Sequence, residues 1–277
     1  MSARREIPLR PMTLGELLDA AVSLLRRRAR LLLSAAAVLA VAEQVVLAPL
    51  REQAGLSAPY FLPEHDIAGW WLLTGLGFAI EATIITLLGA LAAGGVASAL
   101  LGRPVRDRAL WRTCRPVATV LTAVIFGGAC GAAALAGFLP WIFGYGLLGL
   151  AAPALVVDRS GNPFSALARS ARLTSRSGLR GCWVRIAAYL TWFAIRFALG
   201  AGWIAVLTSF SGSWPQWLLL AVPVAWALAD TVAYAALACV DAVLLVEIRV
   251  RTEGLDIALA RARSRGEDET AILVQSS

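Results

Sequence analysis

The chain has 277 residues, of which 59% are hydrophobic and 16% are charged, and its mean hydropathy is +0.72. An ordinary soluble domain is about 45–50% apolar, so this composition excludes soluble enzymes, secreted disulfide scaffolds and coiled coils. The apolar residues are spread evenly, which also excludes one or two anchors attached to a soluble domain. The net charge is +7 and all 25 basic residues are arginine. Because the arginines gather in short loops between apolar segments, we expect a membrane protein that does not bind nucleic acid.

Six apolar stretches are each long enough to cross a bilayer core of about 30 Å as a helix. The sequence therefore predicts an all-α, polytopic membrane protein. Residues 1–256 are expected to form one transmembrane domain, and residues 257–277 a polar cytoplasmic tail that is disordered beyond Arg265. We place the six spans at residues 31–50, 69–101, 117–138, 140–157, 183–208 and 215–248.

The arginines also predict the orientation in the membrane. Residues 1–30 contain seven, the 102–116 loop five, the 158–185 loop six and the tail from Arg249 onward five, whereas the alternate loops contain only Arg51. Cytoplasmic loops of membrane proteins carry an excess of arginine and lysine. We therefore expect a multi-pass protein of the cell (inner or plasma) membrane with both termini in the cytoplasm.

A short amphipathic segment precedes each span that leaves the cytoplasm, and we expect these segments to lie in the membrane interface. The first begins at Thr13, which forms a capping box with Glu16. The second covers Asp107 to Arg115, and the third begins after Pro163. An interfacial helix followed by a hairpin of two spans thus occurs three times, which indicates a threefold repeat. The expected apolar faces contain Leu14, Leu17, Leu18, Ala21, Leu24 and Leu25 in the first segment, and Phe164, Ala166, Leu167, Ala171 and Leu173 in the third.

Two of the predicted spans are too long for the bilayer. Residues 69–101 and 215–248 would each extend about 50 Å as one helix, so they must tilt, break or project into the cytoplasm. Gly94-Gly95 and Pro223 are the candidate break points. Small residues concentrate in the third span, where they favour close helix packing over a pore lining. These small residues are Gly127, Gly131, Ala134 and Gly137.

Several ionisable residues fall inside the predicted spans, namely Glu43, Glu81, Arg196, Asp230 and Asp241. A charge at the bilayer centre costs about 2.5–3.5 kcal/mol on insertion scales, so it needs a partner or water. The last two spans form an antiparallel hairpin, in which residues whose numbers share one sum lie at similar depth. Arg196 with Asp230 and Arg185 with Asp241 share the same sum, and the two arginines are about three helical turns apart. We therefore predict two interhelical ion pairs.

Glu81 is expected at the same depth as Arg196 and Asp230, about 18–22 Å from the outer surface at a rise of 1.5 Å per residue. Glu81, Arg196 and Asp230 would then form one buried polar cluster. Two carboxylates around one arginine leave a negative charge unless one is protonated, which is the composition of a proton or cation site. The alternative is that the cluster only fixes helix register and packing.

Motifs for catalysis or for cofactor binding are missing from the sequence. It has no lysine, no G-x-S-x-G elbow, no phosphate-binding loop and no H-E-x-x-H helix. The single histidine, His65, lies between Glu64 and Asp66, and this trio has no further metal ligands nearby. We expect no enzymatic activity, no cofactor and no metal site.

Three stretches together resemble a known family. They are RP at 10–11 with TLGELLDAA at 13–21, PALVVD at 153–158 leading into ALARSARLT at 166–174, and EIRVRTEGLD at 247–256. The chain is similar to actinobacterial polytopic proteins named after the membrane domain of glycerophosphoryl diester phosphodiesterases, although Glu247 stands where aspartate is commoner. The resemblance implies a six-span helical membrane protein without the separate, histidine-containing catalytic domain of those enzymes.

These considerations predict a non-enzymatic scaffold or accessory component of a cell-envelope or transport system, with a membrane or cytoplasmic protein as a possible partner. One alternative is a small transporter or permease subunit whose site is the Glu81, Arg196 and Asp230 cluster. Another is a protein that handles anionic lipids, because cytoplasmic arginines attract anionic headgroups of the lipid bilayer. The arginines expected to face headgroups are Arg26, Arg27, Arg28, Arg169, Arg172, Arg176, Arg249 and Arg251.

Overall fold

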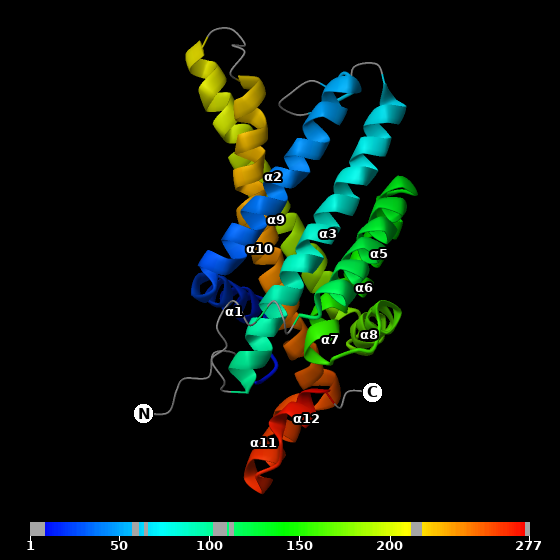
Figure 1. Ribbon diagram of the computed structural model, residues 1–277, viewed down its shortest axis with the longest axis vertical. Helices are drawn as coiled ribbons and strands as arrows, with labels where there is room; N and C mark the ends of the chain where they lie inside the picture. Colours follow the sequence, from blue (N-terminus) through cyan, green and yellow to red (C-terminus); the bar gives the residue numbers. More distant parts are fainter. Residues whose placement is uncertain are drawn as a thin grey trace.

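The computed structural model describes residues 9–56, 61–63, 66–101, 110, 114–211 and 218–274, and it is all-helical (Figure 1). Six helical segments are long and apolar enough to cross a membrane, as the sequence predicted, and the protein is a polytopic all-α membrane protein. These spans are Ala29–Gln53, Ile67–Leu100, Pro116–Leu135, Phe138–Val157, Arg180–Val206 and Ala221–Glu253.

The helices form a bundle with two distinct ends. The C-terminal end of α2 (Ala29–Gln53) and the N-terminal end of α3 (Ile67–Leu100) lie at one end, which we call the distal end. The described part of the chain begins and ends toward the other end, which we call the terminal end (Figure 1). At the terminal end, α1 (Leu14–Arg27) and α8 (Pro163–Arg176) lie across the spanning helices.

The amphipathic segments α1 and α8 begin as the sequence indicates. Thr13 and Glu16 form the predicted capping box of α1, which buries Leu17, Ala21 and Leu24. Asn162 and Ser165 form a second capping box at the start of α8.

The buried face of α8 also contains polar residues that we did not expect there. Arg169 and Ser170 are buried beside Ala166 and Leu173, whereas Phe164 is exposed on the outside of the bundle. Most of the segment from Asp107 to Arg115 lies outside the described residues, so the threefold repeat stays a prediction.

The break points expected in the two long spans are not observed. α3 continues through Gly94 and Gly95, and α10 (Leu218–Glu253) continues through Pro223. The fourth span is interrupted instead, because α6 (Phe138–Leu148) ends before Gly149 and α7 (Ala151–Val157) begins after Leu150. α5 (Pro116–Leu135) turns into α6 at Gly137, which has a positive φ of 116° that favours glycine.

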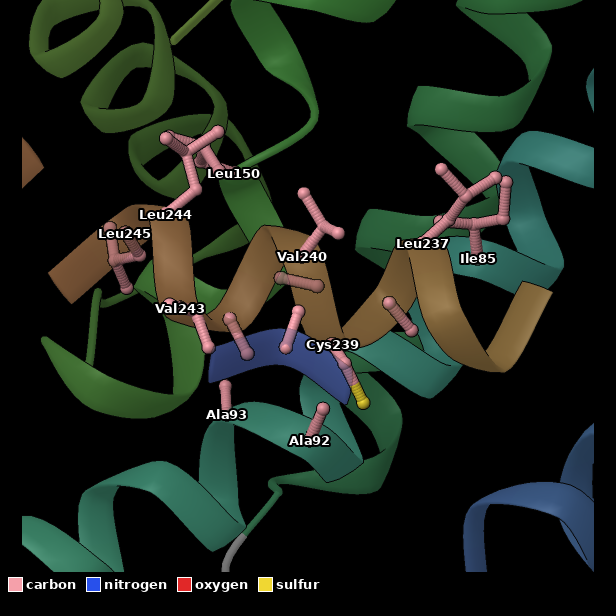
Figure 2. Packing of buried hydrophobic residues seen from close by; sticks show 14 of the residues in the cluster. Ile85, Ala92, Ala93, Leu150, Leu237, Cys239, Val240, Val243, Leu244 and Leu245 are labelled. Atoms are coloured by element: carbon pink, nitrogen blue, oxygen red, sulfur yellow. The ribbon is translucent and has the colours of Figure 1, made fainter. Parts of the chain in front are cut away.

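α10 is the centre of the bundle, because 89% of the residues in its most apolar 18-residue stretch are buried. In the corresponding stretch of α9 (Arg180–Ser211), only 22% of the residues are buried. Figure 2 shows Leu237 and Leu244 of α10 pointing toward Ile85 of α3 and toward Leu150. α10 is thus surrounded by protein, and α9 presents much of its surface to lipid.

The small residues of the third span serve helix packing. A Cβ on Gly127 would lie 2.6 Å from the carbonyl oxygen of Ala79, and one on Gly131 would lie 2.9 Å from that of Gly75. Both positions therefore need glycine so that α5 can approach α3.

Residues 266–274 of the tail are ordered, although we expected disorder beyond Arg265. The chain forms α11 (Leu255–Arg265) and α12 (Glu269–Val274), and Leu259, Ala262 and Leu273 are buried. The sequence appeared polar because only one face of these short helices is apolar.

Candidate functional site

The predicted cluster of Glu81, Arg196 and Asp230 is assembled in the middle of the bundle. Nη1 of Arg196 lies 3.0 Å from Oε1 of Glu81 and 3.4 Å from Oδ1 of Asp230. Burial strengthens such contacts because the surroundings screen charge poorly. α3, α9 and α10 each contribute one charged residue, so the cluster joins these three helices.

Tyrosine hydroxyls extend this cluster to a further acid. Tyr189 donates a hydrogen bond of 3.1 Å to Glu81, and Tyr234 donates one of 2.9 Å to Glu43 on α2. Arg196 also donates to the hydroxyl oxygen of Tyr234, at 3.3 Å. Glu43 thereby becomes a fourth charged member, which the sequence identified as intramembrane but did not assign to the site.

α2 contributes two more polar residues from the same face as Glu43. Gln44 donates a 3.3 Å hydrogen bond to Oδ2 of Asp230, and Nη1 of Arg51 donates to Oε1 of Gln44 at 3.3 Å. From the sequence, we expected Arg51 only as a loop charge. Residues four and seven or eight apart lie on one face of a helix, so the spacing of Glu43, Gln44, Leu47 and Arg51 was the signal that could have revealed this face.

These residues line a polar cavity of about 270 Å³ between α2, α3, α9 and α10. It extends from Leu56, Phe61 and Trp70 near the distal end to the acidic residues inside the bundle. We call it the polar cavity, and its ionisable lining residues are Glu43, Arg51, Glu81, Arg196, Asp230 and Tyr234.

The second predicted ion pair, Arg185 with Asp241, lies deeper in the core. Nε and Nη2 of Arg185 lie 2.7 Å and 2.9 Å from the two carboxylate oxygens of Asp241. Nη1 of Arg185 donates to the carbonyl oxygen of Tyr145 on α6. Arg185 therefore also supplies a partner to backbone near the interruption of the fourth span.

Ser170 supplies hydrogen-bond partners to the backbone where the helix is interrupted between α6 and α7. Its hydroxyl donates to the carbonyl oxygen of Leu147 at 2.7 Å and accepts from the amide of Leu150 at 3.0 Å. Inside a membrane, backbone groups freed by a helix break must find partners within the protein. Gly149 leaves room for Arg185, because a Cβ there would overlap the guanidinium of Arg185.

The prediction that Arg169 and Arg249 face lipid headgroups was wrong. Both side chains are buried beside Asp158, with Nε of Arg169 at 2.9 Å and Nη1 of Arg249 at 2.7 Å from its carboxylate oxygens. Nε of Arg249 also lies 3.0 Å from Oε2 of Glu253. We call Asp158, Arg169, Arg249 and Glu253 the Asp158 network.

The position of Arg169 in α8 was the signal for this network. Arg169 follows Ala166 by three residues and precedes Leu173 by four, which places it on the buried face. Among the other predicted headgroup arginines, Arg28 is half-buried and the rest are exposed, and their contact with lipid stays a prediction. The exposed ones are Arg26, Arg27, Arg172, Arg176 and Arg251.

Metal binding is not indicated by the described part of the chain, where no group of three or more His, Cys, Asp or Glu side chains is arranged to hold an ion. Glu64 and His65 lie outside the described residues. Asp66 caps α3 by accepting a 2.8 Å hydrogen bond from the amide of Gly69.

Comparison with family models, with curated proteins and with solved structures finds no match to this chain. The resemblance to the phosphodiesterase membrane-domain proteins and the expected absence of enzymatic activity therefore stay predictions.

Proposed function

We propose that this membrane protein is a transporter or permease subunit that binds a small organic cation in the polar cavity. The charge of the lining carries this proposal. Glu43, Glu81 and Asp230 supply three carboxylates, whereas Arg51 and Arg196 supply two guanidinium groups. If all five are ionised, one negative charge remains, which protonation or a bound cation must neutralise in a low-dielectric environment.

The environment of Asp230 supports a bound ligand. Its side chain is almost fully buried, and although Oδ1 lies 3.4 Å from Nη1 of Arg196, it accepts no hydrogen bond within the residues that the structure describes. A buried polar atom is normally satisfied by a partner. An ammonium N–H entering the cavity would supply the missing donor.

The aromatic lining favours an organic cation over a bare metal ion. Trp70, Phe193, Phe197 and Trp226 all line the polar cavity. The faces of aromatic rings attract cations, and tryptophan is the strongest of these side chains. The volume of about 270 Å³ lies just below the usual range of about 300–1,000 Å³ for ligand pockets, which supports a small ligand.

The orientation is part of the proposal. The arginine distribution supports a cytoplasmic terminal end, and the polar cavity would then open toward the outside of the cell membrane. The solute would enter from the distal end, past Leu56 and Phe61.

Uptake by the purified protein in liposomes tests this function. We expect accumulation of radiolabelled methylammonium or tetramethylammonium, driven by a membrane potential. Glu43→Gln is expected to abolish it, because this change removes the excess charge without breaking an ion pair seen among the described residues. Glu52→Gln is the matched control, since Glu52 is exposed on the same helix.

Two outcomes would refute the proposal. One is that the wild-type protein transports neither probe and binds neither at millimolar concentration. The other is that Glu43→Gln, shown to be folded by its thermal unfolding profile, takes up the probe as fast as Glu52→Gln.

A further inference from the structure

A second hollow lies on the lipid-facing side of the bundle, between α2, α3 and the start of α5. Its volume is about 510 Å³, and it shares no lining residue with the polar cavity. We call it the α2–α3–α5 groove. Its lining residues on α2 are Leu31, Ser34, Ala35, Val38 and Leu39, and they face Leu87, Leu88 and Leu91 of α3 and Pro116, Thr119 and Val120 of α5.

The polar atoms of the groove are already satisfied by the protein. Ser34 donates to the carbonyl oxygen of Leu31, the Cys114 thiol to that of Ala90, and Thr119 to that of Cys114. The remaining lining is hydrocarbon, and Val38 and Val120 are 69% and 50% exposed. The groove therefore suits an apolar occupant.

The position of the groove in the membrane selects an acyl chain as that occupant. The groove begins near the first turns of α2 and α5, at the terminal-end boundary of both spans. From Leu31 to Leu39 it extends about 12 Å along α2, close to the roughly 15 Å depth of one leaflet. One chain of a lipid in that leaflet would fill it.

Arginines stand at the mouth of the groove. Arg30 is exposed and precedes Ser34 and Val38 at intervals of four residues, so the three share one stripe of α2 with Arg30 at the membrane boundary. Arg28 lies over the next turn of α3, since a Cβ on Gly95 would be 3.6 Å from its Nε. This positive charge at the open end complements an anionic headgroup.

We propose that the α2–α3–α5 groove binds one acyl chain of an anionic phospholipid whose phosphate contacts Arg30 and Arg28. The site does not depend on the proposed transport function. It would attach a structural lipid to the helix that carries Glu43.

Native mass spectrometry of the purified protein, titrated with phosphatidylglycerol or phosphatidylcholine, tests this site. The wild-type protein is expected to retain phosphatidylglycerol in preference. Arg30→Gln should lower that retention about fivefold, in keeping with one surface arginine. Arg172→Gln should leave it unchanged, because Arg172 is exposed on α8, away from the groove.

A second pair of variants tests the acyl-chain contact. Val38→Trp fills the groove and should reduce retention of both lipids, whereas Val41→Trp changes an exposed residue of α2 that does not line it. Equal retention by the two tryptophan variants would overturn the proposal, as would equal binding of the two lipids. A dimer or a co-purifying polypeptide that crosslinks at Val38→Cys would also overturn it.

Discussion

At the scale of single residues, the buried charges hold the bundle together through partners on different helices. Arg185 is 1% exposed and joins Asp241 on α10 to the backbone of α6. Removing one member of a buried pair typically costs about 3–5 kcal/mol, because the other charge is left without compensation. We expect Arg185→Leu to lower the thermal unfolding midpoint in detergent by more than any exposed arginine substitution, with Arg172→Leu as the control.

The double variant Arg185→Leu/Asp241→Leu separates the charge effect from the backbone effect. Replacing both charges by apolar groups removes the uncompensated carboxylate, so part of the stability should return. Full recovery is not expected, because the carbonyl of Tyr145 still lacks its donor. A double variant no more stable than Arg185→Leu would contradict this account of the pair.

The sequence was sufficient to predict that Arg196, Asp230 and Glu81 lie together, but not that Glu43 joins them. Depth along a hairpin follows from residue numbers alone, because each helical residue rises by 1.5 Å. The rotation of α2 about its axis does not follow from them, and that rotation brings Glu43 to Tyr234 and Gln44 to Asp230. The sequence therefore predicted how deep the site lies in the membrane, but it did not identify the residues that α2 contributes.

At the scale of helices, the fourth span breaks where other elements supply partners for its backbone. The guanidinium of Arg185 occupies the space beside Gly149. We expect Gly149→Ala to destabilise the protein by about 1–3 kcal/mol, because the bidentate contact with Asp241 prevents that group from moving aside. In the control Gly144→Ala, the new Cβ would meet that of Ala133 at 3.8 Å, an ordinary contact. Equal unfolding midpoints for the two variants would show that the side chain of Arg185 moves aside at little cost in stability.

The sequence could not place this break because its cause is not local. Gly94 and Gly95 are stronger helix-breaking signals than Gly149 alone, yet α3 continues through them. α3 is packed at this point against Cys114, whose Sγ would lie 3.4 Å from a Cβ on Gly94, an ordinary contact distance. Ser170 and Arg185, which satisfy the break at Gly149, lie 20 or more residues away in the chain.

The capping box of α1 was readable from sequence and makes a pH-dependent prediction. The backbone hydrogen bond from Thr13, and then Arg10, lower the pKa of Glu16 below its ordinary value of 4.5. Because the folded pKa is the lower one, the stabilisation is present above pH 4.5 and is lost as the pH falls through the folded value. We expect Thr13→Ala to cost about 0.5–2 kcal/mol at pH 7.

Glu16→Ala should abolish the part of the stability of α1 that depends on acid. The measurement is the rate of amide hydrogen exchange in α1, compared between pH 7 and a pulse at lower pH. An unchanged acid dependence in Glu16→Ala would assign it to another group.

At the scale of the whole molecule, the polar cavity changes the functional interpretation. From the sequence, two carboxylates around one arginine favoured a scaffold or accessory role, in which the three charges would only fix helix register. The structure adds Glu43, Gln44 and Arg51 and places all of them around a cavity. A register device needs paired charges but no cavity, so the open volume favours a ligand. Charge patterns along a chain do not reveal whether facing helices leave such a volume.

The C-terminal helices complete the terminal end of the bundle, and their docking is testable. Leu273 of α12 is 2% exposed, and its carbonyl oxygen accepts a 3.1 Å hydrogen bond from Arg249 of the Asp158 network. Leu273→Glu would bury a carboxylate beside apolar residues, so we expect α12 to detach. Trypsin should then cleave faster at Arg263, which is half-buried and bound to Glu269 in the docked state. Val274→Glu, at a neighbouring position that is 36% exposed, should leave the cleavage rate unchanged. Equal rates for the two variants would show that Leu273 does not hold α12 in place.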